Sequence, residues 1–457
     1  MTSVASLAPA PETGAPTVAE WLSRLGYPSR RLGPAWLAQA RRTSVEWATK
    51  RGFPTRKDED WKYTRLGPLL AVPFGRAEAG VPDPISSATV DGLTIEGGSP
   101  RLVFVNGLFA PELSSMTELP EGCTITNLAS VLALGGAGLE PFFTRPFSEY
   151  DHAFTAINTA LTRDGAFIHL PAGTVVPAPI ELVFVSDAHG SPDLSNPRSL
   201  ILAESGSRVA VVETYAGTEG DVTFTNAITQ VVLEGGAQVE HYKIQNEPET
   251  GFHLALLDVR QGPNSRFSSG SVALGSNMAR DEVHVRLEGE GAEANIDGLY
   301  LPRGHQQHDN PILIEHAAPR CTSRQLYKGI ADERGHGVFN GRIIVWPGAE
   351  GTDASQTNKN LLLSDHAEID TRPRLEIFTD DVKCTHGAAV GALDEEAVFY
   401  LRSRGVPRAE AKSLLTQAFA REMVGLIPSP SLAAHVDTLV AGRLLTDGSE
   451  TRGTIDE

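Results

Sequence analysis

The spacing of apolar residues changes twice along the chain. Near both ends apolar side chains recur at helical intervals, whereas in the long middle part they alternate with polar ones. The stretch "DEVHVRLEG", for example, places Val283, Val285 and Leu287 on one face of a strand. The pattern predicts a mostly helical region with short strands at 1–165, an all-β body at 166–391 and a helical region at 392–457.

The first part contains three segments with helical periodicity, "TVAEWLSRLG", "PAWLAQARRTSVEWATKRG" and "DHAFTAINTAL". Pro34 suits the first turn of the second helix, and Gly52 suits its end. A short strand, "RLVFVNGLF", begins at Arg101. The first 95 or so residues look helical and polar.

Turn-forming residues punctuate the β body at nearly regular intervals. They centre near Glu219, Gly235, Pro248, Pro263, Asn277 and Glu290, with gaps of 16, 13, 15, 14 and 13 residues. Each gap has room for strands and a tight turn but for no helix. The interval fits an antiparallel sandwich and a stacked β-solenoid equally well, because no residue-level repeat accompanies it.

Two helix signals follow the β body closely. In "LDEEAVFYLRSRG", Asp394 is placed as an N-cap and Gly405 as the stop. Pro407 opens a longer helix, in which Leu414, Leu415 and Phe419 belong to one apolar stripe. A third helix fits "SLAAHVDTLVAGRLL".

Composition limits the partners and the compartment. The formal net charge is −18 with no basic stripe, which argues against nucleic acid or an anionic membrane. No apolar run approaches the roughly 18 residues of a membrane span. The start lacks the features of a secretory signal and reads, like the last dozen residues, as a disordered tail. Three well-separated cysteines argue against a disulfide framework and favour the cytoplasm.

Most familiar catalytic signatures are missing. The sequence has no phosphate-binding G-x-x-x-x-G-K-[ST] loop and no G-x-S-x-G elbow, and "GEGAEA" lies between strands, which indicates a turn. Three histidines, His305, His308 and His316, gather in "RGHQQHDNPILIEH". They are either metal ligands or part of a polar loop and a strand whose inner face holds Ile312 and Ile314.

A cysteine and a histidine stand two residues apart in "DDVKCTHGA". On a strand, Cys384 and His386 share one face, with Cα atoms roughly 6.5–7 Å apart. A thiolate beside an imidazole suits iron or zinc, although a cysteine in a strand is by default a small buried apolar residue. Two ligands do not complete a site, so the remaining ligands of a metal bound here would come from another subunit.

Three stretches resemble the SufB/SufD family of iron–sulfur cluster assembly proteins. The longest is "TRPRLEIFTDDVKCTHGAAVGALDEEAVFYLRSRGV", and "DEDWKYT" and "FTAINTALTRDGAFIHLPAGTVV" are further landmarks in the expected order. The SufB form of the site carries glutamates on both sides of the histidine. Here Thr385 and Gly387 flank His386, and cysteines are sparse, so the chain is most similar to the SufD branch.

The resemblance implies a right-handed parallel β-helix core at 166–391. It also implies a scaffold, not an enzyme, paired with SufB as a heterodimer, or with itself when isolated, and served by the ATPase SufC. A transient iron–sulfur cluster shared with SufB would lie at His386, with Cys384 as a further ligand, and the assembled complex would take a reduced flavin. Leu414, Leu415 and Phe419 would dock the ATPase or pack on the β core.

Two other functions remain open from the residues alone. Many β-helices are polysaccharide-active enzymes, and fold alone does not exclude this class. A metal-storing protein would use the three histidines at 305–316. Turnover of acidic polysaccharide would favour the first, and a stoichiometric metal in the purified protein would favour the second.

Overall fold

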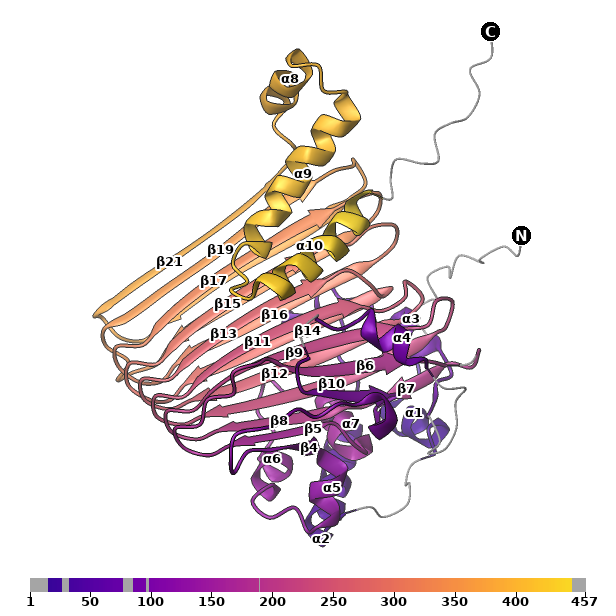
Figure 1. Ribbon diagram of the computed structural model, residues 1–457, viewed down its shortest axis with the longest axis vertical. Coiled ribbons are helices and arrows are strands. Elements are labelled where there is room, and N and C mark those ends of the chain that lie inside the picture. Colours follow the sequence, from indigo (N-terminus) through magenta and orange to yellow (C-terminus); the bar gives the residue numbers. More distant parts are fainter. Residues whose placement is uncertain (1–14, 27–32, 77–84, 96–97, 189, 446–457) are drawn as a thin grey trace.

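The computed structural model describes residues 15–26, 33–76, 85–95, 98–188 and 190–445. The expectations for the first fourteen and the last twelve residues lie outside these ranges. Two long sheets form the body of the molecule, and helices flank both ends of the chain (Figure 1).

Sheet A contains β4 (Thr124–Asn127), β5 (Ala166–Leu170), β8 (Arg198–Ala203), β10 (Thr223–Leu233), β12 (Phe252–Gln261), β14 (Met278–Leu287), β16 (Gln307–His316), β18 (His336–Val345) and β20 (Glu368–Ile377), in that spatial order; β7 (Asp193–Ser195) pairs with β10, and β1 (Gly75–Arg76) with β7. Sheet B contains β3 (Leu108–Phe109), β2 (Arg101–Val105), β6 (Ile180–Ser186), β9 (Arg208–Gly217), β11 (Gln238–Asn246), β13 (Arg266–Ala273), β15 (Glu293–Tyr300), β17 (Thr322–Ala331), β19 (Thr352–Leu362) and β21 (Val382–Gly391).

Successive strands alternate between the two sheets, so each coil of the chain adds one strand to each sheet. From β5 and β6 onward the neighbours within a sheet pair in parallel. The fold is therefore a parallel β-solenoid, as predicted, and not an antiparallel sandwich. Strands β2 and β4, from residues before 166, extend its sheets at the N-terminal end.

The register explains the regular turn spacing. In sheet A, Val231, Val259, Val285, Ile314 and Ile343 occupy one row on successive rungs. Neighbours in this row are 26 to 29 residues apart in sequence, which is one full coil. The intervals between turns correspond to half a coil, because every coil turns once after each of its two strands.

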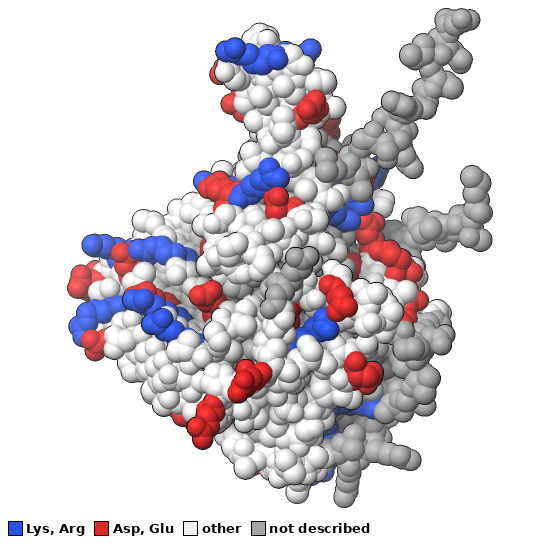
Figure 2. Space-filling model, in the orientation of Figure 1, with Lys and Arg blue, Asp and Glu red and all other residues white. Residues whose placement is uncertain are grey.

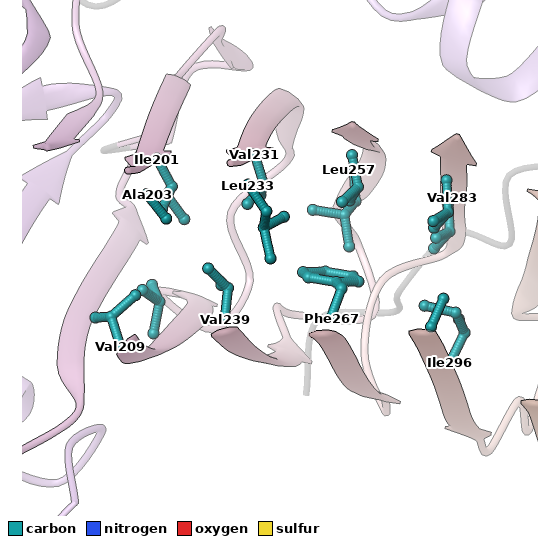
Figure 3. Packing of buried hydrophobic residues seen from close by; sticks show 14 of the residues in the cluster. Ile201, Ala203, Val209, Val231, Leu233, Val239, Leu257, Phe267, Val283 and Ile296 are labelled. Carbon is teal, nitrogen blue, oxygen red and sulfur yellow. The ribbon is translucent and has the colours of Figure 1, made fainter. Parts of the chain in front are cut away.

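One half of the solenoid interior is apolar. Side chains from sheet A, such as Val231 and Leu257, face Val239 and Phe267 from sheet B across a narrow gap (Figure 3). These residues are nearly inaccessible to solvent. Branched and aromatic side chains suit this layer, because they fill the space between two pleated sheets. Burial of each such side chain stabilises the fold by about 1.5–3 kcal/mol.

The other half of the interior is polar and hydrogen-bonded. The Lys243 ammonium donates to the Asp281 carboxylate over 2.7 Å, and the Tyr300 hydroxyl donates to the Asn360 side-chain oxygen over 2.6 Å. Each of these four residues is buried. Partnering of this kind is required, because a buried polar group without a partner costs about 1–3 kcal/mol.

Helices cover the outer faces of both sheets. The helices before the solenoid are α1 (Val18–Arg24), α2 (Ala35–Arg51), η1 (Glu59–Trp61), α3 (Gly67–Ala71), α4 (Ser87–Asp91), η2 (Pro111–Leu113), α5 (Leu128–Ala133), α6 (Glu140–Thr144) and α7 (Ala153–Leu161). Of these, α1 and α7 pack with η1 against apolar residues of sheet A, including Phe224 and Phe252. After the solenoid come α8 (Glu395–Ser403), α9 (Arg408–Val424) and α10 (Pro430–Leu445), and the last two pack against sheet B.

Candidate functional site

Cys384 and His386 lie on β21, the last strand of sheet B. Each aligns with a residue of β19: Cys384 with Ala354 and His386 with Gln356. Both partners are buried inside the solenoid. Because side chains alternate along a strand, Cys384 and His386 face the same interior side, as their spacing predicts.

The solenoid is open at this end. Among the described strands, β20 pairs only with β18 and β21 only with β19, so each sheet ends there with an unpaired edge of ten residues. From Thr385 to Gly391 every residue of β21 is exposed. A Cβ atom added at Gly387 or Gly391 would meet nothing within 4 Å, so the edge is accessible to another backbone.

Cys384 is the less accessible member of the pair. It is half-buried and packs against the apolar core. Its interior row continues down sheet B through Ala354, Ser323, Ala294, Phe267 and Val239. Burial raises the pKa of the Cys384 thiol, so at neutral pH the free chain holds it in the protonated, weakly nucleophilic form.

His386 is exposed at the mouth of the interior, directly above Gln356. Among the residues that the structure describes, no three His, Cys, Asp or Glu side chains converge on one point. On the inner side of β21 the described chain thus offers two donors, one imidazole and one thiol. A metal or cluster bound here needs ligands from elsewhere, because tetrahedral sulfur and nitrogen sites take four.

The three histidines near residue 310 do not form a site. His308 and His316 both lie on β16 and point inside the solenoid, where His308 hydrogen-bonds the Gly275 carbonyl and His316 the Ser323 hydroxyl. Burial lowers the pKa of His308 to about 3 and that of His316 to about 4, so both are neutral. Eight residues of extended strand separate them by about 26 Å. They act as partnered core residues, and Ile312 and Ile314 share their inner face as predicted.

The three residues of the apolar stripe on α9 have different surroundings. Leu414 is 46% exposed, whereas Leu415 and Phe419 are half-buried. The buried Lys328 ammonium of sheet B lies 4.1 Å from the centre of the Phe419 ring and donates to the Phe419 carbonyl. Phe419 therefore packs on the solenoid, and the exposed apolar surface lies nearer the start of α9.

The motif "DEDWKYT" braces the same end of the solenoid, which sequence reasoning missed. Glu59 binds Arg372, and the Asp60 carboxylate accepts a hydrogen bond from Arg374 over 2.7 Å. Both arginines project from β20, the last strand of sheet A. The opposite charges of "DED" and "TRPRLE" are visible in the sequence, but more than 300 residues separate them.

A buried arginine completes this contact. Arg280 of β14 donates to the Asp60 carbonyl over 3.0 Å, to the Glu282 carboxylate over 2.6 Å and also to Asp309. Its guanidinium stacks 3.7 Å from the centre of the Trp61 ring. The segment 59–65 is thereby fastened across β14, β16, β18 and β20, and β20 lies beside the strand that carries His386.

On the face drawn in Figure 2, Lys and Arg are interspersed with Asp and Glu, without a continuous basic stripe. Within the described ranges, every helix is too short or too polar to cross a bilayer.

Comparison with known proteins gives a family for the whole arrangement. Residues 184–419 match the model of the SUF system FeS cluster assembly, SufBD core domain, and residues 31–182 match that of the SufBD protein N-terminal region. An iron–sulfur cluster assembly SufBD family protein of Synechocystis is 33% identical, covering 86% of this chain and 88% of its own length. The iron–sulfur cluster assembly protein SufD of Escherichia coli is 32% identical, covering 86% of this chain and 90% of its own length. The protein of the same name from Bacillus subtilis is 26% identical, covering 88% of this chain and 92% of its own length. The chain with this open-ended solenoid belongs to the SufB/SufD family of iron–sulfur cluster assembly proteins.

Proposed function

We propose that this chain is a cytoplasmic SufD-type scaffold subunit, which pairs with SufB and builds an iron–sulfur cluster at the shared interface while the ATPase SufC drives the complex. The observation that carries the proposal is the open end of the solenoid. Two ten-residue strand edges are unpaired there. One of them belongs to β21, the only described strand that carries a cysteine and a histidine at adjacent inner positions.

Unpaired strand edges favour a protein partner. Each presents backbone donors and acceptors that a second chain can extend, and a long exposed edge is otherwise prone to aggregation. Such an edge is usually protected by charged side chains or by being short. From Thr385 to Gly391 the strand carries no Asp, Glu, Lys or Arg. A paralogous solenoid docked end to end would cover both edges.

The cluster is the cargo of this site, and His386 is its main ligand from this chain. A neutral imidazole donates one nitrogen lone pair to iron, and the partner supplies thiolates. Cys384 plays a secondary part, because its thiol is half-buried against the core and its pKa is raised by burial. In the same proposal the assembled complex takes electrons from a reduced flavin.

The test is co-expression of the tagged chain with SufB and SufC under anaerobic conditions. The three proteins should copurify with iron and sulfide and with the visible absorbance of a cluster. A tagged chain that is folded but captures neither partner would contradict the proposal. The same complex lacking only iron and sulfide would restrict the error to the cluster site.

The ATPase-docking surface is expected on α8 and the start of α9. These helices extend beyond β21 (Figure 1), and on α8 only Val398 is buried. Phe399 and Tyr400 on α8 are 71% and 58% exposed, and Leu414 on α9 is 46% exposed. Large exposed aromatic side chains are typical anchors of protein interfaces.

Phe399→Glu or Leu414→Glu should weaken capture of SufC at least about tenfold, because each places a charge in an apolar contact. Binding of SufC by surface plasmon resonance measures the effect, and the melting temperature should not change. Leu134→Glu is the matched control, since Leu134 is 90% exposed but follows α5 at the far end of the molecule. Equal affinity for all three variants would place the docking surface elsewhere.

Point substitutions are preferable to deletion of the whole tail from Leu393. Helices α9 and α10 bury Met423, Leu432 and Val436 against sheet B, and Glu422 pairs with the buried Lys328. Removing them would expose this apolar surface and leave a buried ammonium without its carboxylate. A loss of binding after such a deletion would then be ambiguous.

A further inference from the structure

Two stacked glutamines lie inside the solenoid directly below His386. The interior row that ends at His386 passes down sheet B through Gln356, Gln325, Ile296, Ser269 and His241. Gln356 and Gln325 are 1% and 3% exposed. Amide side chains at this depth require partners, because an unpaired buried polar atom costs about 1–3 kcal/mol.

One arm of the Gln356 amide has a partner and the other does not. Its Nε2 donates to the Gln325 Oε1 over 2.6 Å, which points that arm toward the rung below. Its Oε1 is buried without a hydrogen-bond partner in the described chain. Because the two arms of an amide diverge, the free oxygen does not point at the rung below, and the next rung in the row above it carries His386.

The opposite sheet makes room for this amide. Gly341 of β18 faces Gln356 across the interior, and a Cβ atom at position 341 would lie 2.0 Å from the Gln356 Nε2. Any larger residue at this position would displace the amide. The unpartnered oxygen is thus the end of a built arrangement of Gly341, Gln325 and Gln356, and not a side chain loose in solvent.

We propose that Gln356 is a positioning residue for His386. When the exposed imidazole turns inward, the free carbonyl oxygen of Gln356 accepts a hydrogen bond from one ring N–H. The other ring nitrogen then keeps its lone pair for the ligand. This inference deepens the proposed function and rests on it for the identity of the ligand. In a neutral imidazole only one nitrogen carries hydrogen, so a fixed acceptor selects one tautomer.

The consequence for iron is direct. Histidine ligands of metals almost always donate their second N–H to a fixed acceptor, and loss of that acceptor typically weakens metal binding about 10–100-fold. Without Gln356, His386 would sample both tautomers and more orientations. Fewer molecules would then present the correct lone pair when the partner arrives.

The tautomer is measured by nitrogen NMR of the isolated full-length chain labelled with ¹⁵N-histidine, about two pH units above the usual histidine pKa of about 6.5. His386→Gln assigns the signal by its disappearance. The wild-type chain should show one dominant tautomer for His386. Gln356→Met, which keeps the side-chain length without an acceptor oxygen, should give signals averaged between the two tautomers.

Two further variants separate positioning from packing. Gln325→Met removes the acceptor that holds the Gln356 Nε2, so it should loosen the Gln356 amide and shift the His386 tautomer only partly. Gly341→Ala should displace the Gln356 amide from the opposite sheet and reproduce the averaged signal. A single unchanged tautomer in folded Gln356→Met, or an equal change in Gln325→Met, would overturn the proposal.

The assembled complex supplies a second, independent readout. The Gln356→Met complex should lose its iron at a chelator concentration at least about tenfold below the one that the wild type requires. This is the usual effect of losing such an acceptor on metal affinity. If the wild-type complex holds no cluster but the tautomer still depends on Gln356, the proposed function fails and the positioning role stands. If the cluster forms and the tautomer ignores Gln356, the reverse holds.

Discussion

His386→Ala should abolish accumulation of the iron–sulfur cluster in the SufB–SufC–chain complex while leaving the chain folded. The imidazole is exposed on the last strand of sheet B, so truncation creates no cavity. It removes the one nitrogen donor that we assign to iron. Iron and sulfide content and visible absorbance of the anaerobically purified complex measure the effect, and we expect them to fall to background.

Cys384→Ser serves as the matched variant. It lies on the same strand and interior side, but its thiol packs against the core and burial raises its pKa. The main thiolates are expected from SufB, so cluster content should fall less than in His386→Ala. A fully loaded His386→Ala complex would contradict the ligand role. Failure of that variant to pair with SufB would assign the histidine to the interface instead.

Arg280→Met should be the most damaging single substitution for stability, with a loss of about 3–5 kcal/mol. Burial alone would lower the pKa of Arg280, but Asp309 and Glu282 outweigh burial and raise it, so the guanidinium is charged. Methionine would leave the buried Asp309 carboxylate without its cation and the Asp60 carbonyl without this donor, and Glu282 would keep only His152 as a basic partner. Denaturant unfolding followed by fluorescence measures the change.

The loss should grow with pH. Burial already raises the pKa of Asp309 while Arg280 is present, and loss of the guanidinium should raise it further, whereas Glu282 keeps its contact with His152. A carboxyl group with a raised pKa binds its proton more tightly in the folded state, so its contribution to stability falls as pH rises. The gap between variant and wild type should therefore widen from about pH 5 to about pH 8.

Arg286→Met on the same strand is the control. Arg286 is 42% exposed and pairs with Glu288 and Glu315 near the surface, so its removal should cost less than about 1 kcal/mol. Similar losses for the two arginines would mean that the Arg280 network contributes no more than a surface ion pair.

The periodic parts of the chain were the most predictable from sequence. Alternation in "DEVHVRLEG" correctly placed Val283, Val285 and Leu287 inside, because a two-residue period follows from strand geometry alone. The turn interval indicated half a coil but did not distinguish a solenoid from a sandwich. That choice depends on which strands pair, and pairing partners lie a full coil away.

Residues governed by distant contacts were not predictable in this way. Arg280 alternates outward like a surface residue, yet "DEDWKYT" covers it from 220 positions earlier in the chain. Gln356 and Asn360 are polar but point inward, because the interior hydrogen bonds that satisfy them come from other coils. The shared face of Cys384 and His386 could be predicted from the sequence, since both residues belong to one strand.

The brace formed by "DEDWKYT" limits how the solenoid can change in length. Asp60 reaches Arg280 on β14 and Arg374 on β20 simultaneously, so it spans a set number of rungs. Inserting one coil between them would move Arg374 by about 4.8 Å, beyond hydrogen-bonding reach. The motif therefore fixes the number of rungs from β14 to β20 in sheet A, and a coil inserted or deleted between these two strands would break the brace.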